Sequence, residues 1–245
     1  MKPYDLDRKY LPSYLPFSEE INYFIRIIYI RLKYLFTGFP PALALYKKRN
    51  IIFIHIPKNA GSSIVKSLYD DGISHSSALY YKTIDEEFFR KTESFALLRN
   101  PIDRFCSAFN YLKFHSKQEP NIKFRNSHLQ DINNVSDLIT KMKFDPSFKS
   151  MILRFPHFRT QSEYVCNKKG EIIVNRIGHL DFLESFTNEI SSYIHQPFNI
   201  EHINKSNNQK EISIIDVEFI ENLYKLDLNL EYKVLENVDK ILTTT

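Results

Sequence analysis

Residues 51–63 read IIFIHIPKNAGSS, an apolar run followed by a turn that carries a lysine. The first six residues are almost all β-branched or aromatic, which is typical of a strand buried on both faces of a parallel sheet. Pro57 ends this run, and residues 62–69 are predicted to be helical, with Asp70-Asp71-Gly72 as the stop. Strand, short loop and helix in this order indicate one unit of an α/β fold.

The same order recurs further along the chain. Residues 94–98 (SFALL) predict a second buried strand that ends at Arg99, and residues 102–114 predict a helix with Pro101 in its first turn. Two such units in succession favour a parallel sheet. Weaker patterns predict helices over residues 84–92, 135–142, 182–190 and 216–226, and a short strand over 172–174.

Residues 57–63 lie where a phosphate-binding loop is expected. The backbone N–H groups that open a helix, together with the helix dipole, favour an anion. Lys58 adds a charge, and the hydroxyls of Ser62 and Ser63 add donors. The sequence therefore predicts an α/β, P-loop-like three-layer fold with a central parallel sheet flanked by helices. The lysine precedes Gly61, whereas a Walker A loop places it after the glycines, which disfavours a nucleotide kinase.

A second candidate anion site follows the second strand, where residues 97–112 read LLRNPIDRFCSAFNYL. Arg99 ends the strand and Ser107 comes eight residues later on the helix. This spacing allows a guanidinium and a hydroxyl to converge on one phosphate, which arginine binds in a bidentate manner. For Asp103 and Arg104 we favour a simpler role, an ion pair at the start of the helix.

The two motifs together resemble those of carbohydrate sulfotransferases that use 3′-phosphoadenosine 5′-phosphosulfate (PAPS). Residues 55–63 resemble that family's loop H-x-P-K-T/S-G/A-G/S-T/S-S/T, and residues 99–109 resemble R-N/D-P-x-D/E-R-x-x-S-x-Y/F. The resemblance implies that the first motif binds the 5′-phosphosulfate and the second the 3′-phosphate. The implied ligand-binding residues are Lys58, Asn59, Ala60, Gly61, Ser62, Ser63, Arg99 and Ser107.

The implied reaction moves a sulfuryl group from PAPS to a hydroxyl of a carbohydrate acceptor. The acceptor must lose a proton, and histidine is the usual base near neutral pH. His75, in ISHSSALYYK, matches a family segment at this place and is the predicted catalytic base. Lys58 has a second predicted role, which is to stabilise the charge that grows on the bridging oxygen. No metal is expected.

The resemblance continues in the second half of the chain. Residues 158–165 (FRTQSEYV), 174–183 (VNRIGHLDFL) and 202–206 (HINKS) are similar to family segments. His179 and Asp181 stand where the family usually has arginine and glutamate. The residues that match are Gln161, Tyr164, Ile177, Gly178, Asn204 and Ser206, with Tyr224, Asp227 and Tyr232 near the end.

Composition limits the class of protein. The chain has 245 residues, 43% of them hydrophobic and 25% charged, which suits one α/β domain. The resemblance begins at residue 51 and implies a sulfotransferase domain over residues 51–245, preceded by an N-terminal helical and irregular extension over residues 1–50. The net charge of +4 permits an anionic ligand but predicts no nucleic-acid partner. Cys106 and Cys166 stand in no zinc-binding pattern and are expected to be reduced thiols. The sequence does not predict an oligomeric state.

Residues 21–36 predict a basic, strongly apolar helix that has two interpretations. We favour packing on the domain core, because an apolar helical stripe usually faces a core. The alternative is peripheral association with a membrane surface. The longest uncharged run, residues 34–46, is too short to span a bilayer. Residues 1–20 show no signal-peptide pattern, and related eukaryotic enzymes usually carry an anchor, so the predicted location is the cytoplasm of a bacterial-type cell.

Alternative functions remain open at this point. Basic and aromatic residues of the middle segment could line a groove for an acidic glycan, or could simply form a solvated surface. They are Lys113, Phe114, Lys117, Lys123, Phe124, Arg125, Arg154 and Arg159. The other two function classes are a P-loop kinase, which would bind ATP–Mg²⁺, and a non-catalytic glycan- or membrane-binding protein that keeps the fold.

Overall fold

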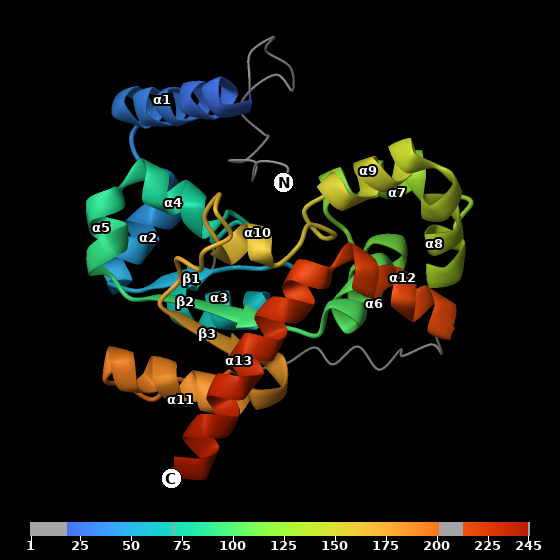
Figure 1. Ribbon diagram of the computed structural model, residues 1–245. Coiled ribbons are helices and arrows are strands. Elements are labelled where there is room, and N and C mark those ends of the chain that lie inside the picture. Colours follow the sequence, from blue (N-terminus) through green and yellow to red (C-terminus); the bar gives the residue numbers. More distant parts are fainter. Residues whose placement is uncertain (1–18, 71, 201–212, 245) are drawn as a thin grey trace. The chain divides into compact units, whose positions relative to one another are not determined.

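The structure is a computed structural model that describes residues 19–70, 72–200 and 213–244 (Figure 1). The chain divides into two compact units. The first, called here the sheet unit, comprises Met1–Ile56, Ala60–Leu98 and Gln161–Ile203. The second, the helical unit, comprises Pro57–Asn59, Arg99–Thr160 and Asn204–Thr245.

A three-stranded parallel sheet forms the centre of the sheet unit. Its strands are β1 (Ile52–Ile54), β2 (Ser94–Leu98) and β3 (Arg176–His179), in the order β1-β2-β3. Ile54 pairs with Ala96, and Leu98 with His179. Every residue of β1 and β2 is buried, as their continuous apolar runs predict. The carboxyl ends of all three strands therefore meet at one edge, from which the chain leads into the two predicted anion-binding motifs.

Helices flank this sheet, which confirms the predicted α/β class with a central parallel sheet. Figure 1 shows α4 and α10 on one side of it and α11 on the other. The helices of the sheet unit are α1 (Glu19–Thr37), α2 (Pro41–Arg49), α3 (Gly61–Tyr69), α4 (Ala78–Ile84), α5 (Glu86–Lys91), α10 (Ser162–Val165) and α11 (Leu183–Ile194), with a 3₁₀ turn over Leu180–Phe182.

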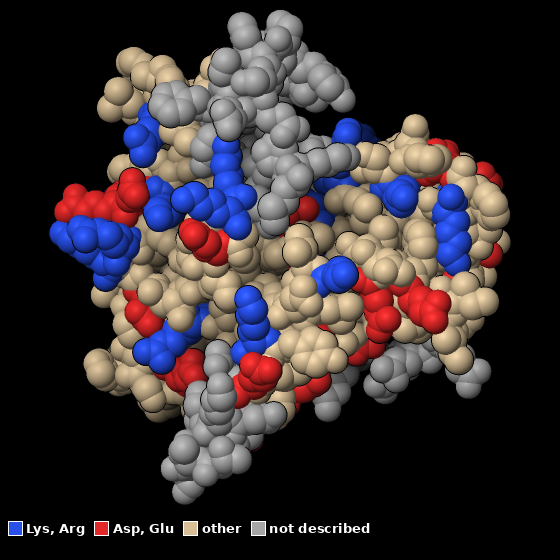
Figure 2. All heavy atoms as spheres, in the orientation of Figure 1, with Lys and Arg blue, Asp and Glu red and all other residues tan. Residues whose placement is uncertain are grey.

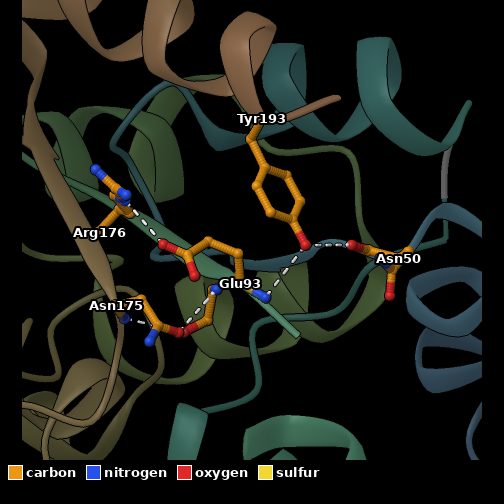
Figure 3. Close-up of polar contacts among 6 residues, drawn as sticks. Asn50, Glu93, Asn175, Arg176 and Tyr193 are labelled. Carbon is orange, nitrogen blue, oxygen red and sulfur yellow. Dashed lines mark hydrogen bonds and ion pairs between the residues drawn. The ribbon is translucent and has the colours of Figure 1, made fainter. Parts of the chain in front are cut away.

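Polar contacts join the strands at the amino end of the sheet (Figure 3). Asn175 Oδ1 accepts hydrogen bonds from the backbone N–H of Ser94 at 3.0 Å and from its hydroxyl at 2.6 Å. Arg176 Nε donates to Glu93 Oε1 at 2.8 Å. Tyr193, on α11, donates to the carbonyl oxygen of Asn50 at 3.0 Å. These bonds hold β2, β3 and α11 together at the amino end of the sheet.

The predicted strand over residues 172–174 is wrong, because the third strand comes a few residues later. Ile172 forms only an isolated antiparallel bridge with Cys166. Gly170 has φ 80°, and the backbone N–H of Asn167 donates to the carbonyl oxygen of Glu171 at 2.8 Å. This tight turn folds the apolar run back on the preceding segment before the chain enters β3.

The helical unit has its own hydrophobic core. Its helices are α6 (Pro101–Asn110), α7 (Glu119–His128), α8 (Val135–Phe144), α9 (Pro146–Arg154), α12 (Ile214–Leu223) and α13 (Lys225–Thr244), and a π-helix (Tyr111–His115) continues α6. Phe105, Leu112, Met142 and Tyr224 are among the buried core residues. Apolar side chains at helical spacing on α6, α8 and α12 meet here, which explains why these helices pack together.

The N-terminal segment contributes α1 and α2 to the sheet unit. Pro41 occupies the first position of α2, where a proline is tolerated. Tyr46 on α2 is fully buried, and its hydroxyl donates to the carbonyl oxygen of Phe53 at 2.6 Å. The division at residue 50 into an extension and a sulfotransferase domain stays a prediction. Among the described residues, none of the helices has the length and apolar character needed to cross a membrane.

Candidate functional site

The loop between β1 and α3 has an unusual backbone. Lys58 has φ 73° and Ala60 has φ 56°, both in the left-handed region that residues other than glycine rarely adopt. Such conformations cost of order 1 kcal/mol each and cluster at ligand-binding sites. Ala60 therefore has a left-handed backbone conformation, which glycine adopts more readily than alanine.

Arg99 reaches back from the end of β2 to this loop. Its Nη1 donates a hydrogen bond to the carbonyl oxygen of Lys58 at 3.2 Å. Lys58 stands four residues after β1, and Arg99 stands directly after β2, so the two motifs follow neighbouring parallel strands. Lys58 and Arg99 therefore meet within the helical unit, to which both residues belong.

The Lys58 ammonium occupies a mostly buried position beside other cationic and aromatic groups. Its Nζ lies 4.0 Å from the centroid of the Tyr111 ring, which is a cation–π contact. Burial, and then the charge of Arg99, lower the pKa of Lys58 from 10.5 to about 8. An anion bound beside both cations would offset their repulsion and raise that pKa again.

Arg104 is a third basic residue at the loop. It is 1% exposed, and its Nε donates to the carbonyl oxygen of Pro57 at 3.1 Å. Its Nη2 is buried and has no hydrogen-bond partner within the described parts of the chain. The predicted ion pair between Asp103 and Arg104 is wrong, because successive helical residues point in different directions and Arg104 faces the loop.

Ser107 lies on the same face of α6. Arg104, Ser107 and Tyr111 are three and seven residues apart, a spacing that places them along one side of a helix. Arg104 contacts Pro57 and Tyr111 contacts Lys58, so Ser107, which is 8% exposed, is directed toward the same loop.

The start of α6 is held in place by Asn100. Its side-chain oxygen accepts hydrogen bonds from the backbone N–H of Ile102 at 3.1 Å and of Asp103 at 3.3 Å. This N-cap, followed by Pro101 at the first helical position, ends β2 and turns the chain sharply into the helix. The Asn-Pro pair thus positions both Arg99 before it and Ser107 after it.

The sheet unit holds the other predicted site residues. A Cβ added to Gly61 would lie 2.2 Å from Cδ2 of His55, so only glycine allows the ring to stay where it is. His75 is half-buried, and its Nδ1 lies 3.1 Å from the carbonyl oxygen of His55. A carbonyl can only accept, so Nδ1 carries the proton and Nε2 is the basic nitrogen of the neutral ring. This tautomer suits a general base.

The predicted residues therefore divide between the two units. Ser62 is exposed at the first turn of α3, and Ser63, half-buried beside it, donates its backbone N–H to the carbonyl oxygen of Ala60 at 3.2 Å. The helical unit contains Lys58, Asn59, Arg99 and Ser107, and the sheet unit contains Ala60, Gly61, Ser62, Ser63 and His75. Within the described residues, no three His, Cys, Asp or Glu side chains cluster as metal ligands would.

Comparisons with known proteins give no match. Neither the models of protein families, nor the curated proteins, nor the solved structures yielded a significant similarity to this chain.

The later segments with family resemblance have mainly structural roles in the described part of the chain. A Cβ on Gly178 would lie 2.4 Å from Cδ2 of Phe186, so glycine lets α11 pack closely on β3. His179 is buried, and its Nδ1 accepts from the backbone N–H of Asp181 at 3.3 Å. Gln161, Tyr164, Tyr224 and Asp227 are buried, Ile177 is half-buried and Tyr232 is exposed, whereas Asn204 and Ser206 lie outside the described residues.

Several residues of the proposed glycan groove have local partners. Lys113 Nζ donates to the carbonyl oxygens of Leu129 at 2.7 Å and Gln130 at 3.0 Å. Lys123 pairs with Glu119 on α7. Phe124 and Arg159 are buried, while Phe114, Lys117 and Arg154 are exposed and Arg125 is half-buried. These residues therefore do not form a single exposed basic surface.

Sequence reasoning missed Tyr111 and gave Arg104 a different role. The spacing of the residues could have indicated both roles. Arg104 and Tyr111 lie on the same side of the continuous helix as Ser107, which was already a predicted ligand-binding residue. The π-helix that begins at Tyr111 could not be predicted, although such segments are frequent at functional sites.

Proposed function

We propose that this chain is a sulfotransferase on a P-loop-like three-layer fold, which transfers the sulfuryl group of PAPS to a hydroxyl of a carbohydrate. The observation that carries the proposal is the pairing of Lys58 with Arg99. The Arg99 guanidinium lies against the Lys58 backbone at 3.2 Å, and its charge contributes to the lowered pKa of the Lys58 ammonium. Two cations brought together after neighbouring strands favour a multiply charged anion as the ligand.

The residues of the two motifs have the chemistry that a bisphosphorylated nucleotide needs. In this proposal, Lys58, Asn59 and the start of α3 from Ala60 to Ser63 bind the 5′-phosphosulfate. Arg99 and Ser107 bind the 3′-phosphate. The buried Nη2 of Arg104 offers a further donor, since it lacks a hydrogen-bond partner within the described residues. An anionic ligand would satisfy that donor and stabilise the charge of Lys58.

The reaction assigns a separate task to each side chain. His75 Nε2 takes the proton of the acceptor hydroxyl as the new oxygen–sulfur bond forms. The bond between sulfur and the bridging oxygen breaks, and its electron pair stays on that oxygen, which leaves with adenosine 3′,5′-bisphosphate. Lys58 stabilises the growing negative charge there, by analogy with phosphoryl transfer. The acceptor proton remains on His75 until it passes to solvent.

Thermal unfolding in the presence of nucleotides tests the ligand class. Adenosine 3′,5′-bisphosphate should raise the midpoint of wild-type unfolding, whereas ATP with Mg²⁺ should raise it much less. Lys58→Ala should remove the shift with bisphosphate, because the substitution removes the ammonium proposed to bind the 5′-phosphate. Lys66→Ala, on the exposed side of α3, is the matched control and should keep the full shift.

Two results would contradict the proposal. A larger shift with ATP–Mg²⁺ than with the bisphosphate would favour the P-loop kinase. No shift with either nucleotide would favour a protein that keeps the fold without binding a nucleotide.

A further inference from the structure

Helix α1 uses one of its faces to pack on α4. Ile30 is 2% exposed, Arg31 Nε donates to the carbonyl oxygen of Thr83 at 3.2 Å, and the hydroxyl of Tyr34 bonds to that of Tyr80. Figure 1 shows α1 on the outer side of α4, away from the sheet. The sequence-based expectation of a helix packed on the domain is therefore correct for this face.

A second face of α1 is also apolar, and it is exposed. Its residues, called here the outer stripe, are Ile28, Leu32, Leu35 and Phe36, with Phe39 just after the helix. Leu35 is 75% exposed and Phe36 is 82% exposed. The spacing of four, three and one residues places the helical members on one side of the helix. Packing against α4 therefore explains only part of the apolar character of α1.

The charge of the chain is concentrated in the same segment. Residues 21–49 contain six basic residues and no acidic residue. The whole chain has a net charge of +4, so the remaining residues together carry two more acidic than basic side chains. Figure 2 shows acidic and basic side chains side by side at the left, where Figure 1 has α5. On that helix Lys91 pairs with Glu87 at 2.7 Å. Three basic residues of the segment also have acidic partners, since Arg31, Lys47 and Arg49 pair with Glu86, Asp85 and Asp70, and the segment keeps its surplus of positive charge.

We propose that the outer stripe binds the surface of an anionic lipid bilayer, with α1 lying in the plane of the interface. An apolar helical face within a basic segment has the two properties that such binding requires, namely buried apolar area and attraction to anionic headgroups. A second copy of the chain fits less well, because pairing two outer stripes would bring two positively charged segments together. This inference does not depend on the proposed sulfotransferase activity.

Sedimentation with lipid vesicles tests the proposal on the full chain. The wild-type protein should sediment with vesicles in which half of the lipid is phosphatidylglycerol, and much less with vesicles of pure phosphatidylcholine. Raising the salt concentration should weaken the binding, since the headgroup attraction is screened. The double variant L35E/F36E should lose at least about tenfold in partitioning, because it places two acidic groups on the apolar face.

A matched variant controls for exposed apolar residues in general. Phe144 is 83% exposed and Ile214 is 78% exposed, and both belong to the helical unit. F144E/I214E should bind the anionic vesicles like the wild type, and both double variants should keep the wild-type unfolding temperature. Equal binding by L35E/F36E and wild type would overturn the proposal. So would a wild-type dimer that L35E/F36E abolishes in the absence of vesicle binding, since the stripe would then serve a second copy.

Discussion

Lys58 is held as a cation in surroundings that disfavour its charge. Burial and the neighbouring Arg99 lower the pKa of its ammonium to about 8, while the unfolded chain keeps the ordinary 10.5. Between these two pH values the unfolded state binds more protons than the folded state. The contribution of Lys58 to the free energy of unfolding therefore rises as the pH increases from about 8 to 10.5.

We expect this dependence on pH to appear as a difference in the free energy of unfolding between the wild type and Lys58→Met. Below pH 8 the variant should be the more stable protein, by on the order of 2 to 3 kcal/mol, because it removes a disfavoured charge. The advantage should shrink as the pH rises from about 8 toward 10.5. Urea unfolding of both proteins at several pH values measures this difference in the free energy of unfolding. A pH-independent difference would show that Lys58 has an ordinary pKa.

At the scale of one element, the N-terminus of α6 links stability to ligand binding. Asn100 caps this helix directly after Arg99, and Asn134 caps α8 in the same way through a 2.8 Å bond to the backbone N–H of Asp137. Each alanine substitution should lower the free energy of unfolding by about 1 kcal/mol. Only Asn100→Ala should also weaken binding of adenosine 3′,5′-bisphosphate, by about fivefold, because it loosens the turn that orients Arg99.

Chemical unfolding and calorimetric titration of the two variants separate these effects. If Asn134→Ala weakens nucleotide binding as much as Asn100→Ala does, general destabilisation explains both results and the positioning role is lost. Asn100→Ser, which keeps a capping oxygen, should restore both stability and affinity.

The elements that sequence reasoning predicted well are those with strong local signals. β2 has the predicted bounds, and α3 and α6 begin within one residue of their expected starts, since a buried apolar run or a proline at the first turn marks them. α2 was missed because Pro40 and Pro41 suggested a break. β3 was placed too early because the apolar run at 172–174 is stronger than the strand itself, in which Gly178 leaves room for α11.

Across the whole molecule, the motifs could be read from the sequence but their surroundings could not. The contact of Arg99 with the Lys58 backbone is explained by the positions of the two residues, which follow neighbouring parallel strands. The spacing of Arg104, Ser107 and Tyr111 indicates that they share one side of a helix. Which groups of the loop that side meets depends on tertiary packing, which brings Tyr111 to Lys58 and leaves Nη2 of Arg104 without a hydrogen-bond partner among the described residues. The acceptor is not indicated in this way, because the basic residues of the middle segment form no single exposed surface, and two of them, Lys113 and Lys123, are used in local contacts.

The activity itself is the last prediction. Radiolabelled PAPS incubated with a panel of acidic and neutral polysaccharides should transfer label to at least one of them. Lys58→Ala should reduce this transfer by more than about 100-fold, because the charge on the leaving oxygen loses its partner. His75→Ala should reduce it strongly at neutral pH, since Nε2 is the proposed base, while Lys66→Ala should retain full activity. Binding of adenosine 3′,5′-bisphosphate without transfer to any polysaccharide would contradict the carbohydrate acceptor. Full activity of Lys58→Ala would contradict the catalytic site, because Lys58 is the residue assigned to the charge on the bridging oxygen.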